Sequence, residues 1–378
     1  MMRWKPDNDI LEKAVELRHE LHKKPELSMQ EKWTKAYLID FIKENTSLQI
    51  VDRGKWFYCC YKKDQSKKNI AFRADFDAVP VEEAKDFVPY CSQNRGAAHK
   101  CGHDGHSAAL AAFALVLDRY GAECNVYLLF QHAEETGQGA KECLPFLEEN
   151  SINEIFAVHN MPGLELGAVA ASSGVVQYAS TGMILRFSGK KSHACYPEDG
   201  INPAYAMSEM ILSLEELRLK KGYRGLTLIT VIQVNVGEHA FGTSAGEGEL
   251  LLTVRGEHGK ELRDLCMSIE ALAVEKAKKY GLQCAVRYED EFEDCFNHSN
   301  SVDKIRRAVS QAGIPLQELK EPFRASEDFG RFTKQVPGAI FYVGAGVDHA
   351  ALHTADYDFP DSIIETIVSA YRSITDLF

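Results

Sequence analysis

Apolar and polar residues follow two different periods along this chain, and together they predict an α/β protein. A helical period covers residues 9–43 with a break at Lys24-Pro25, and it returns at 106–120 and 139–149. Short apolar runs between these helices predict strands at 48–52, 56–61, 69–75, 125–131 and 154–159. Strands that alternate with helices favour a mixed, partly parallel sheet flanked by helices.

The middle of the chain has another order of elements. We expect strand, helix, strand, strand, helix and strand at 181–188, 202–221, 226–236, 249–255, 260–280 and 283–288. This βαββαβ order is that of a ferredoxin-like sandwich. Helices at 301–312 and 362–374 and a strand at 338–343 then complete the first pattern. We therefore predict a discontinuous domain of residues 1–176 and 291–378, with a smaller domain of residues 177–290 inserted into it.

Composition narrows the classes of function. The chain has 378 residues, more than one hydrophobic core usually fills. Its net charge of -12 leaves no basic surplus for phosphates, which argues against nucleic acid as a partner. No apolar run is long enough to span a membrane, and the N-terminus lacks the apolar core of a signal peptide. The ten cysteines include no C-x-x-C pair, so we expect a reduced, cytoplasmic protein.

The most informative chemistry lies in C-G-H-D-G-H, residues 101–106, together with the later pair Glu134-Glu135. A cysteine and a histidine two residues apart offer ligands that suit a transition metal. Adjacent glutamates can divide metal binding and proton transfer between them. If His159 and His353 join them, the ligands are too many for one closed structural zinc. Such a set suits an open, two-metal hydrolytic centre.

The candidate residues share a position at the ends of predicted strands. Asp75 ends one strand, Glu134-Glu135 follow another, His159 ends a third, and His353 lies in a loop after a fourth. Open α/β sheets gather functional groups at the carboxyl ends of their strands. Each residue alone also has a structural interpretation, as a buried cysteine, a solvated acidic pair or an ordinary histidine. Their convergence favours a site.

Other polar residues and glycines give weaker evidence of a function. We interpret His19, His106 and His132 as structural or supporting residues, and the acidic run at 289–294 as a solvated hinge. Gly344 and Gly346 do not follow a phosphate-loop pattern, which argues against nucleotide binding.

Nearly the whole chain resembles the M20 family of metallopeptidases and amidohydrolases, and within it the N-acyl-L-amino acid amidohydrolases. The motifs that carry the resemblance are L-R-H-E-L-H-K-K-P-E-L-S-M-Q-E (17–31), F-R-A-D-F-D-A-V-P (72–80), A-H-K-C-G-H-D-G-H (98–106), L-L-F-Q-H-A-E-E (128–135), A-V-H-N-M-P-G (157–163), S-G-K-K-S-H-A-C-Y-P (188–197), S-E-D-F (326–329) and L-H-T-A-D (352–356). Independent motifs in the family's order leave little room for coincidence.

The resemblance implies roles for single residues. Glu134 matches the general base, and Asp75 matches an aspartate that orients the site, with Asp77 as the alternative. His193 matches a lid histidine that reaches a catalytic pocket across a dimer, which makes the inserted domain a lid and dimerisation domain. The ligands of the implied two-metal centre, with the thiolate shared between the ions, are Cys101, His103, Glu135, His159 and His353.

The implied reaction is hydrolysis of the linear amide of a small N-acyl amino acid. Two divalent ions, zinc or else manganese, cobalt or nickel, would activate a water. Glu134 would take its proton and later deliver it to the amine, while the metal and His193 stabilise the oxyanion.

The chain departs from the family's motifs at two places, and two alternative functions remain. His132 stands where relatives have proline, and residues 240–245 lack the asparagine of an A-F-N-V-I-P segment that helps to bind substrate, which leaves substrate identity open. A dipeptidase or other exopeptidase of the superfamily is one alternative, against which Cys101-x-His103 argues. A non-catalytic metal-binding relative is the other, against which the retained Glu134 and Glu135 argue.

Overall fold

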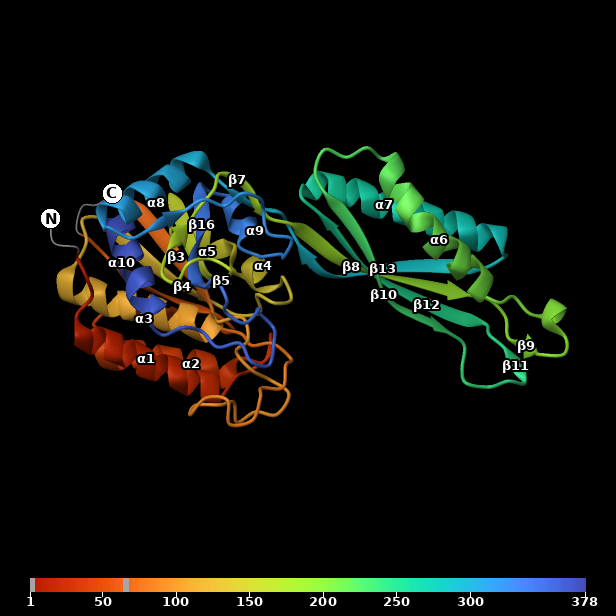
Figure 1. Ribbon diagram of the computed structural model, residues 1–378, viewed down its shortest axis with the longest axis horizontal. Helices are drawn as coiled ribbons and strands as arrows, with labels where there is room; N and C mark the ends of the chain where they lie inside the picture. The colour runs from red at the N-terminus through yellow and green to blue at the C-terminus, as the bar shows by residue number, and fades with distance from the viewer. Residues whose placement is uncertain (1–3, 64–67) are drawn as a thin grey trace. The chain divides into compact units, whose positions relative to one another are not determined.

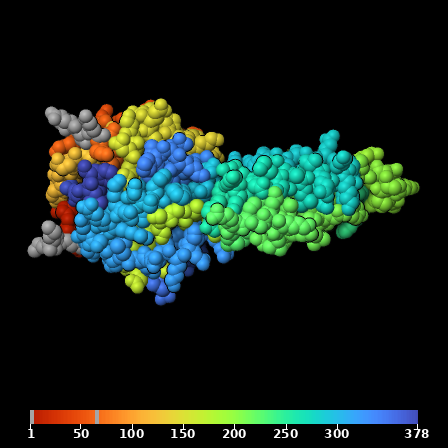
Figure 2. All heavy atoms as spheres, turned by 90° about the horizontal axis from the view of Figure 1, so that it is seen from above, coloured from red at the N-terminus to blue at the C-terminus, as the bar shows by residue number. Residues whose placement is uncertain are grey.

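The computed structural model describes residues 4–63 and 68–378, which form two compact units. One unit contains the described residues up to Val176 together with Phe296–Glu321 and Asp328–Phe378, and the other contains Gln177–Cys295 and Pro322–Glu327. The second boundary between the units thus follows Cys295 instead of residue 290. Residues 322–327 go with the second unit, where Gln177 pairs with Phe323. Within the first unit, the blue C-terminal residues pack directly against yellow and orange residues (Figure 2).

The first unit is built on a mixed sheet of eight strands in the described part of the chain. Their order is β1 (Gln49–Asp52), β2 (Phe57–Tyr61), β4 (Asn125–Gln131), β3 (Asn69–Asp75), β5 (Glu154–Pro162), β16 (Gly338–Gly346), β6 (Val169–Ala170) and β15 (Leu316–Gln317). The central strands β4, β3, β5 and β16 are parallel, whereas β1, β2 and β6 join antiparallel. The expected mixed sheet is confirmed, and four central strands end at one edge.

Helices cover both faces of this sheet, because its buried strands carry apolar side chains on each side. On one face α3 (His103–Tyr120), α8 (Ser299–Gln311) and α10 (Ile363–Thr375) pack, and α1 (Asn8–Lys23) and α2 (Lys32–Asn45) lie against α3 (Figure 1). The short helices α4 (Gly139–Cys143), α5 (Pro145–Glu149) and α9 (Gly330–Thr333) cover the other. Among the described residues, no helix has the length and apolar character that a membrane crossing needs.

Several boundaries differ from the expected ones for local reasons. α3 begins at His103 instead of 106, because Gly102 with φ 97° starts the helix directly after Cys101. The helix expected at 139–149 is two helices, and the second begins at Pro145. The interpretation of residues 289–294 as a hinge was partly wrong. Strand β13 (Gln283–Phe292) runs into this segment with an irregularity at Asp290, because it pairs with β8.

The second unit is a βαββαβ sandwich. Its four-stranded sheet, counted over the described residues, has the order β10 (Thr227–Val236), β12 (Glu247–Gly256), β8 (Ala179–Ser188) and β13, all antiparallel. Helices α6 (Ala204–Lys220) and α7 (Gly259–Lys279) close its core, which confirms the ferredoxin-like unit. A small two-stranded antiparallel sheet belongs to the same unit, made of β9 (Ser192–His193) and β11 (Thr243–Ser244), with the short helix η1 (Pro197–Asp199) after β9. Strands β7 (Gly174–Gln177) and β14 (Cys295–Asn297) lie where the chain passes between the units.

Candidate metal centre

The predicted ligands meet at the carboxyl edge of the sheet in the first unit. Cys101 and His103 lie at the start of α3, Glu135 follows β4, His159 is on β5, and His353 lies in the loop after β16. Cys101 Sγ is 3.5 Å from His159 Nε2, and His353 Nε2 is 3.3 Å from Glu135 Oε1. His103 Nε2 is 3.7 Å from that same glutamate oxygen. The five side chains therefore form one small cluster.

The ligand atoms of this cluster fall into two sets that share Cys101. Atoms of Cys101, His103 and His159 lie within 4.8 Å of one another, and so do atoms of Cys101, Glu135 and His353. His103 Nε2 is buried and, within the described chain, has no hydrogen-bond partner. Leaving such an atom unpaired is costly unless it binds a ligand. Thiolate, imidazole and carboxylate groups in this arrangement fit two divalent ions.

Acceptors behind the two buried histidines fix the orientation of their rings. His103 Nδ1 lies 3.1 Å from both the side-chain Oδ1 and the carbonyl oxygen of Asp77, so Nδ1 donates and Nε2 faces the cluster. His159 Nδ1 donates to the carbonyl of Asn160 at 2.6 Å, which leaves Nε2 toward Cys101. Histidines that bind metals commonly use one nitrogen in this way.

The two aspartates after β3 take different positions. Asp77 contacts His103, and its Oδ2 accepts the backbone N–H of Glu135 at 3.0 Å. Asp75 lies 2.7 Å from His106 Nδ1 and 3.8 Å from His103 Nε2. The carboxylate directly behind a predicted ligand is therefore that of Asp77, and Asp75 holds His106 in place.

Burial and negative charge together set the protonation states of the cluster. Burial alone would lower the pKa of His103, but neighbours led by Asp75 raise this pKa to about 10. Burial holds the pKa of His159 well below its usual range. Burial raises the pKa of the Cys101 thiol, and the Glu135 carboxylate raises it further. A bound cation would reverse this effect on the thiol, because it stabilises the thiolate.

Glu134 lies beside the ligands and is held by the backbone. Its side chain is buried, with Oε2 3.9 Å from His103 Nε2. Its Oε1 accepts the N–H of Asp328 at 3.2 Å. The preceding Ala133 has φ 48°, which turns the chain sharply after β4, and Glu31 Oε1 accepts the Ala133 N–H at 2.8 Å. This turn presents Glu134 next to the cluster, where a proton acceptor is useful.

Some supporting residues were not singled out from the sequence. The Asp328 carboxylate accepts hydrogen bonds from Arg73 at 2.7 Å and from Gln131 at 2.9 Å, next to its backbone contact with Glu134. Glu31 supports the turn at Ala133. Both residues stand in motifs that resemble the family, S-E-D-F and P-E-L-S-M-Q-E. These motifs were therefore the available signal, but the contacts are long-range and no local pattern reveals them.

His193 belongs to the other unit, where it lies exposed on the two-stranded sheet of β9 and β11. Its Nδ1 accepts the N–H of Cys195 at 3.1 Å, and His193 pairs with Thr243 on the neighbouring strand β11. The N–H of Ala194 donates to the carbonyl of Gly242 at 3.0 Å. His193 is thus in a different unit from the predicted ligands.

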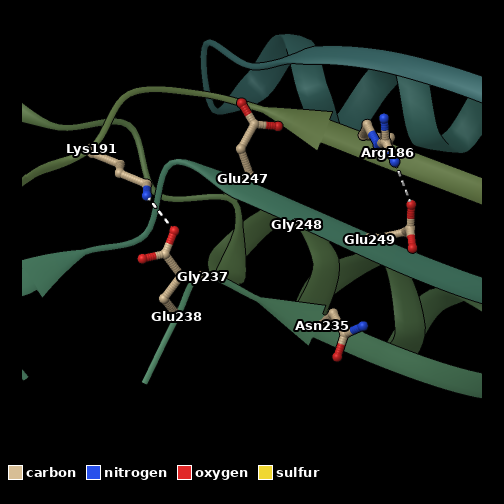
Figure 3. Close-up of a pocket in the computed structure, with 8 residues that line it drawn as sticks. All are labelled: Arg186, Lys191, Asn235, Gly237, Glu238, Glu247, Gly248 and Glu249. Atoms are coloured by element: carbon tan, nitrogen blue, oxygen red, sulfur yellow. Dashed lines mark hydrogen bonds and ion pairs between the residues drawn. The ribbon is translucent and has the colours of Figure 1, made fainter. Parts of the chain in front are cut away.

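The second unit also has a shallow hollow of about 480 Å³, shown in Figure 3. Both of its basic residues are paired with carboxylates, Lys191 with Glu238 at 2.7 Å and Arg186 with Glu249 at 2.9 Å. Glu247 accepts a hydrogen bond from Ser188 at 2.8 Å. None of the predicted ligands lines it, and we assign no chemistry to it.

Comparisons with known proteins agree with this geometry. The model of Peptidase family M20/M25/M40 matches residues 71–376. The chain is 28% identical over 365 residues to the N-acetyl-L-cysteine deacetylase of Bacillus subtilis, which covers 95% of this chain and 86% of that protein. It is 25% identical over 366 residues to the N-acetyldiaminopimelate deacetylase of Exiguobacterium sibiricum, with 95% and 97% covered. The crystal structure of the YXEP protein of Bacillus subtilis, described as a dinuclear metal binding peptidase from the M20 family, matches with a TM-score of 0.82 at 22% identity, over 98% of this chain and 99% of that one.

Proposed function

Because the chain belongs to peptidase family M20/M25/M40, we propose that it is a metal-dependent amidohydrolase that removes the acyl group from a small N-acyl amino acid. The observation that carries the proposal is the cluster of predicted ligands at one sheet edge, with Glu134 beside it. Two related proteins bear the names of deacetylases of N-acetyl amino acids, which supports this substrate class.

The proposed cofactor is a pair of divalent ions. Cys101, His103 and His159 would hold one ion, and Cys101, Glu135 and His353 the other, with the thiolate shared. When bound, the ions would lower the pKa of a water and polarise the scissile carbonyl. A thiolate with imidazoles suits zinc, while the carboxylate admits manganese, cobalt or nickel. The description of the YXEP protein as dinuclear supports the number of ions.

The protein's own residues then handle protons and orientation. Glu134 takes the proton of the attacking water and delivers it to the departing amine nitrogen. Asp77 keeps His103 in its binding orientation, and Asp75 supports the site through His106. His193 contributes to stabilising the negative charge that develops on the carbonyl oxygen.

The second unit is proposed to act as the lid and to join two copies into a homodimer. β10 lies at the edge of its sheet, and α6 contacts β10. Exposed apolar side chains lie on the edge strand and recur every seven residues along the helix: Val231, Ile232, Val234, Tyr205, Leu212 and Leu219. An unpaired strand edge beside an apolar face suits isologous association. The dimer would bring His193 of one copy to the metal centre of the other.

Sedimentation of Leu212→Glu/Leu219→Glu tests the dimer. We expect a monomer that keeps its metal and loses turnover. A fully active monomer would show that His193 does not act across an interface.

The cysteines support a cytoplasmic location as part of the proposal. All ten are free, and most are buried. We expect ten titratable thiols per chain in protein that is denatured directly from cells. A stable disulfide would contradict this location.

The function is tested with metal-free protein, to which zinc, manganese, cobalt or nickel is added back. We expect metal-dependent release of amine from a panel of N-acetyl amino acids, with little activity on dipeptides. Glu134→Gln should lower kcat by about 10²–10⁴-fold while metal binding is kept. The control Glu148→Gln removes an exposed glutamate of α5 and should leave kcat unchanged.

The same panel separates the alternatives. Preferential cleavage of dipeptides would replace the proposal with an exopeptidase. Two bound ions without turnover of either substrate class would indicate a non-catalytic relative.

A further inference from the structure

We propose that Lys100 is a positioning residue that clamps the loop bearing His353 to the segment bearing Cys101. By doing so it sets the affinity of the metal position formed by Cys101, Glu135 and His353. This inference rests on the proposed function, because it takes His353 as a ligand.

His353 has less support from regular structure than the other predicted ligands. The described chain has no helix or strand between the end of β16 at Gly346 and the start of α10 at Ile363. The His353 side chain is 49% exposed. Its φ of 63° lies in the left-handed region, which is unfavourable for a residue with a Cβ. Contacts from outside the loop must therefore hold this backbone in place.

Lys100 supplies two such contacts. Its carbonyl accepts the N–H of His353 at 2.7 Å, and its ammonium donates to the carbonyl of Tyr357 at 2.7 Å. The side chain of Lys100 is fully buried, and the residue directly precedes Cys101. Lys100 thus hydrogen-bonds to both ends of residues 353–357 and connects them to the segment that carries Cys101.

The carboxylate of Glu83 compensates the charge of the buried Lys100 ammonium. Lys100 Nζ donates to Glu83 Oε1, and His22 Nε2 lies 2.9 Å from that oxygen. The other oxygen accepts the N–H of Ser92 at 2.5 Å. Burial opposes ionisation, but His22 and Lys100 lower the pKa of Glu83 to about 2. The carboxylate is therefore charged at neutral pH, which compensates the lysine.

Separate anchors hold the far end of the loop. Asp358 pairs with Arg18 and accepts the hydroxyl of Tyr90 at 2.7 Å, and Phe359 is buried in the core. Removing the Lys100 ammonium would therefore loosen residues 353–357 while the loop end stays attached. His103 and His159 lie on α3 and β5, outside this loop. The effect should accordingly fall on one metal position and spare the other.

The test compares Lys100→Met with the wild type as full-length, metal-free protein. Stepwise Co²⁺ affinities are measured by competition with a chelator, and the thiolate-to-cobalt absorption band follows Cys101. We expect one of the two affinities to fall by about 10–100-fold, with the other within twofold. Amide hydrogen exchange in the peptide 346–360 should become faster.

Two further variants complete the design. Lys100→Met leaves Glu83 with one cation fewer, so Lys100→Met/Glu83→Gln removes both charges and keeps the test valid if the single variant does not fold. The control Lys304→Met removes the partner of Glu154 in the same unit, away from the cluster, and should leave both affinities unchanged.

Each result of these measurements either supports or overturns the proposed role of Lys100. Unchanged affinities in the variants that fold would overturn the role of Lys100. Equal losses at both positions would also overturn it, because they indicate a general structural defect. A wild-type protein that binds no Co²⁺ would instead refute the proposed function, and this role with it.

Discussion

Glu31 gives a quantitative test of the electrostatics around the site. The residue is 6% exposed, and its Oε1 accepts the N–H of Ala133 at 2.8 Å. Burial, and then the charge of Asp77, raises the pKa of Glu31 from 4.5 to about 7. We predict that Glu31→Gln is nearly as stable as the wild type at pH 4 and clearly more stable at pH 8, both compared as metal-free protein.

The sign follows from proton linkage. Because the pKa of Glu31 is higher in the folded state than in the unfolded chain, proton binding favours folding. This contribution to stability is complete below about pH 4.5 and is lost as the pH rises through 7. A difference of about 2.5 between the two pKa values corresponds to about 3 kcal/mol. Of this, about 2.5 kcal/mol falls between pH 5 and 8. Glutamine does not ionise and still offers a carbonyl to the Ala133 N–H, so the variant avoids the loss.

Urea unfolding at pH 5, 6, 7 and 8 measures the difference in unfolding free energy between the two proteins. Glu142→Gln is a control of opposite sign. Burial raises the pKa of Glu142, but Lys55 and His132 together lower it by more, so the net pKa is below the usual value. The carboxylate is therefore already ionised between pH 5 and 8. That variant should be less stable than the wild type at every pH of the series, because it loses the contacts of a carboxylate with Lys55 and His132. For Glu31→Gln, a difference that stays constant from pH 5 to 8, or that favours the wild type at pH 8, would refute the reasoning.

Two further predictions concern the support of the ligands. Asp77→Asn should weaken metal binding by about 10–100-fold in a chelator competition, since Asp77 orients His103; a larger loss in Asp75→Asn would give that role to Asp75 instead. Gly102→Ala should lower the free energy of unfolding in urea by about 2 kcal/mol or more, because φ is 97° and a Cβ would lie 2.3 Å from Asn160 Oδ1. Unchanged unfolding of this variant would show that the backbone can relax there.

Glu135 and His159 could be found from the sequence because they lie near the ends of strongly apolar strands, whereas Cys101 and His103 were marked by the motif C-G-H-D-G-H. β3, β4 and β5 are short, buried and parallel, so their ends had to meet at one edge. His353 was harder to place, because the loop after β16 has no periodicity. The family motif L-H-T-A-D, not the pattern of apolar residues, marked it.

The choice between Asp75 and Asp77 shows where pattern reasoning ends. The two residues are two positions apart, so both could face the same way if the strand continued. The strand ends at Asp75, and Phe76 donates its N–H to the carbonyl of Gln131 at 3.0 Å as the chain turns. This turn brings Asp77 beneath His103, and only the folded chain reveals it.

The buried cations were beyond sequence reasoning, because arginine and lysine are rarely fully buried unless paired. Arg73 is separated by 255 residues from its partner Asp328, and it also binds Asp75 at 2.6 Å. These fixed guanidinium contacts neutralise carboxylates that lie behind the ligands. Glu135, in front of them, contacts His353 and His103 instead of an arginine or lysine. The fold thus compensates the supporting carboxylates internally and leaves negative charge among the ligands, where a pair of divalent cations can compensate it.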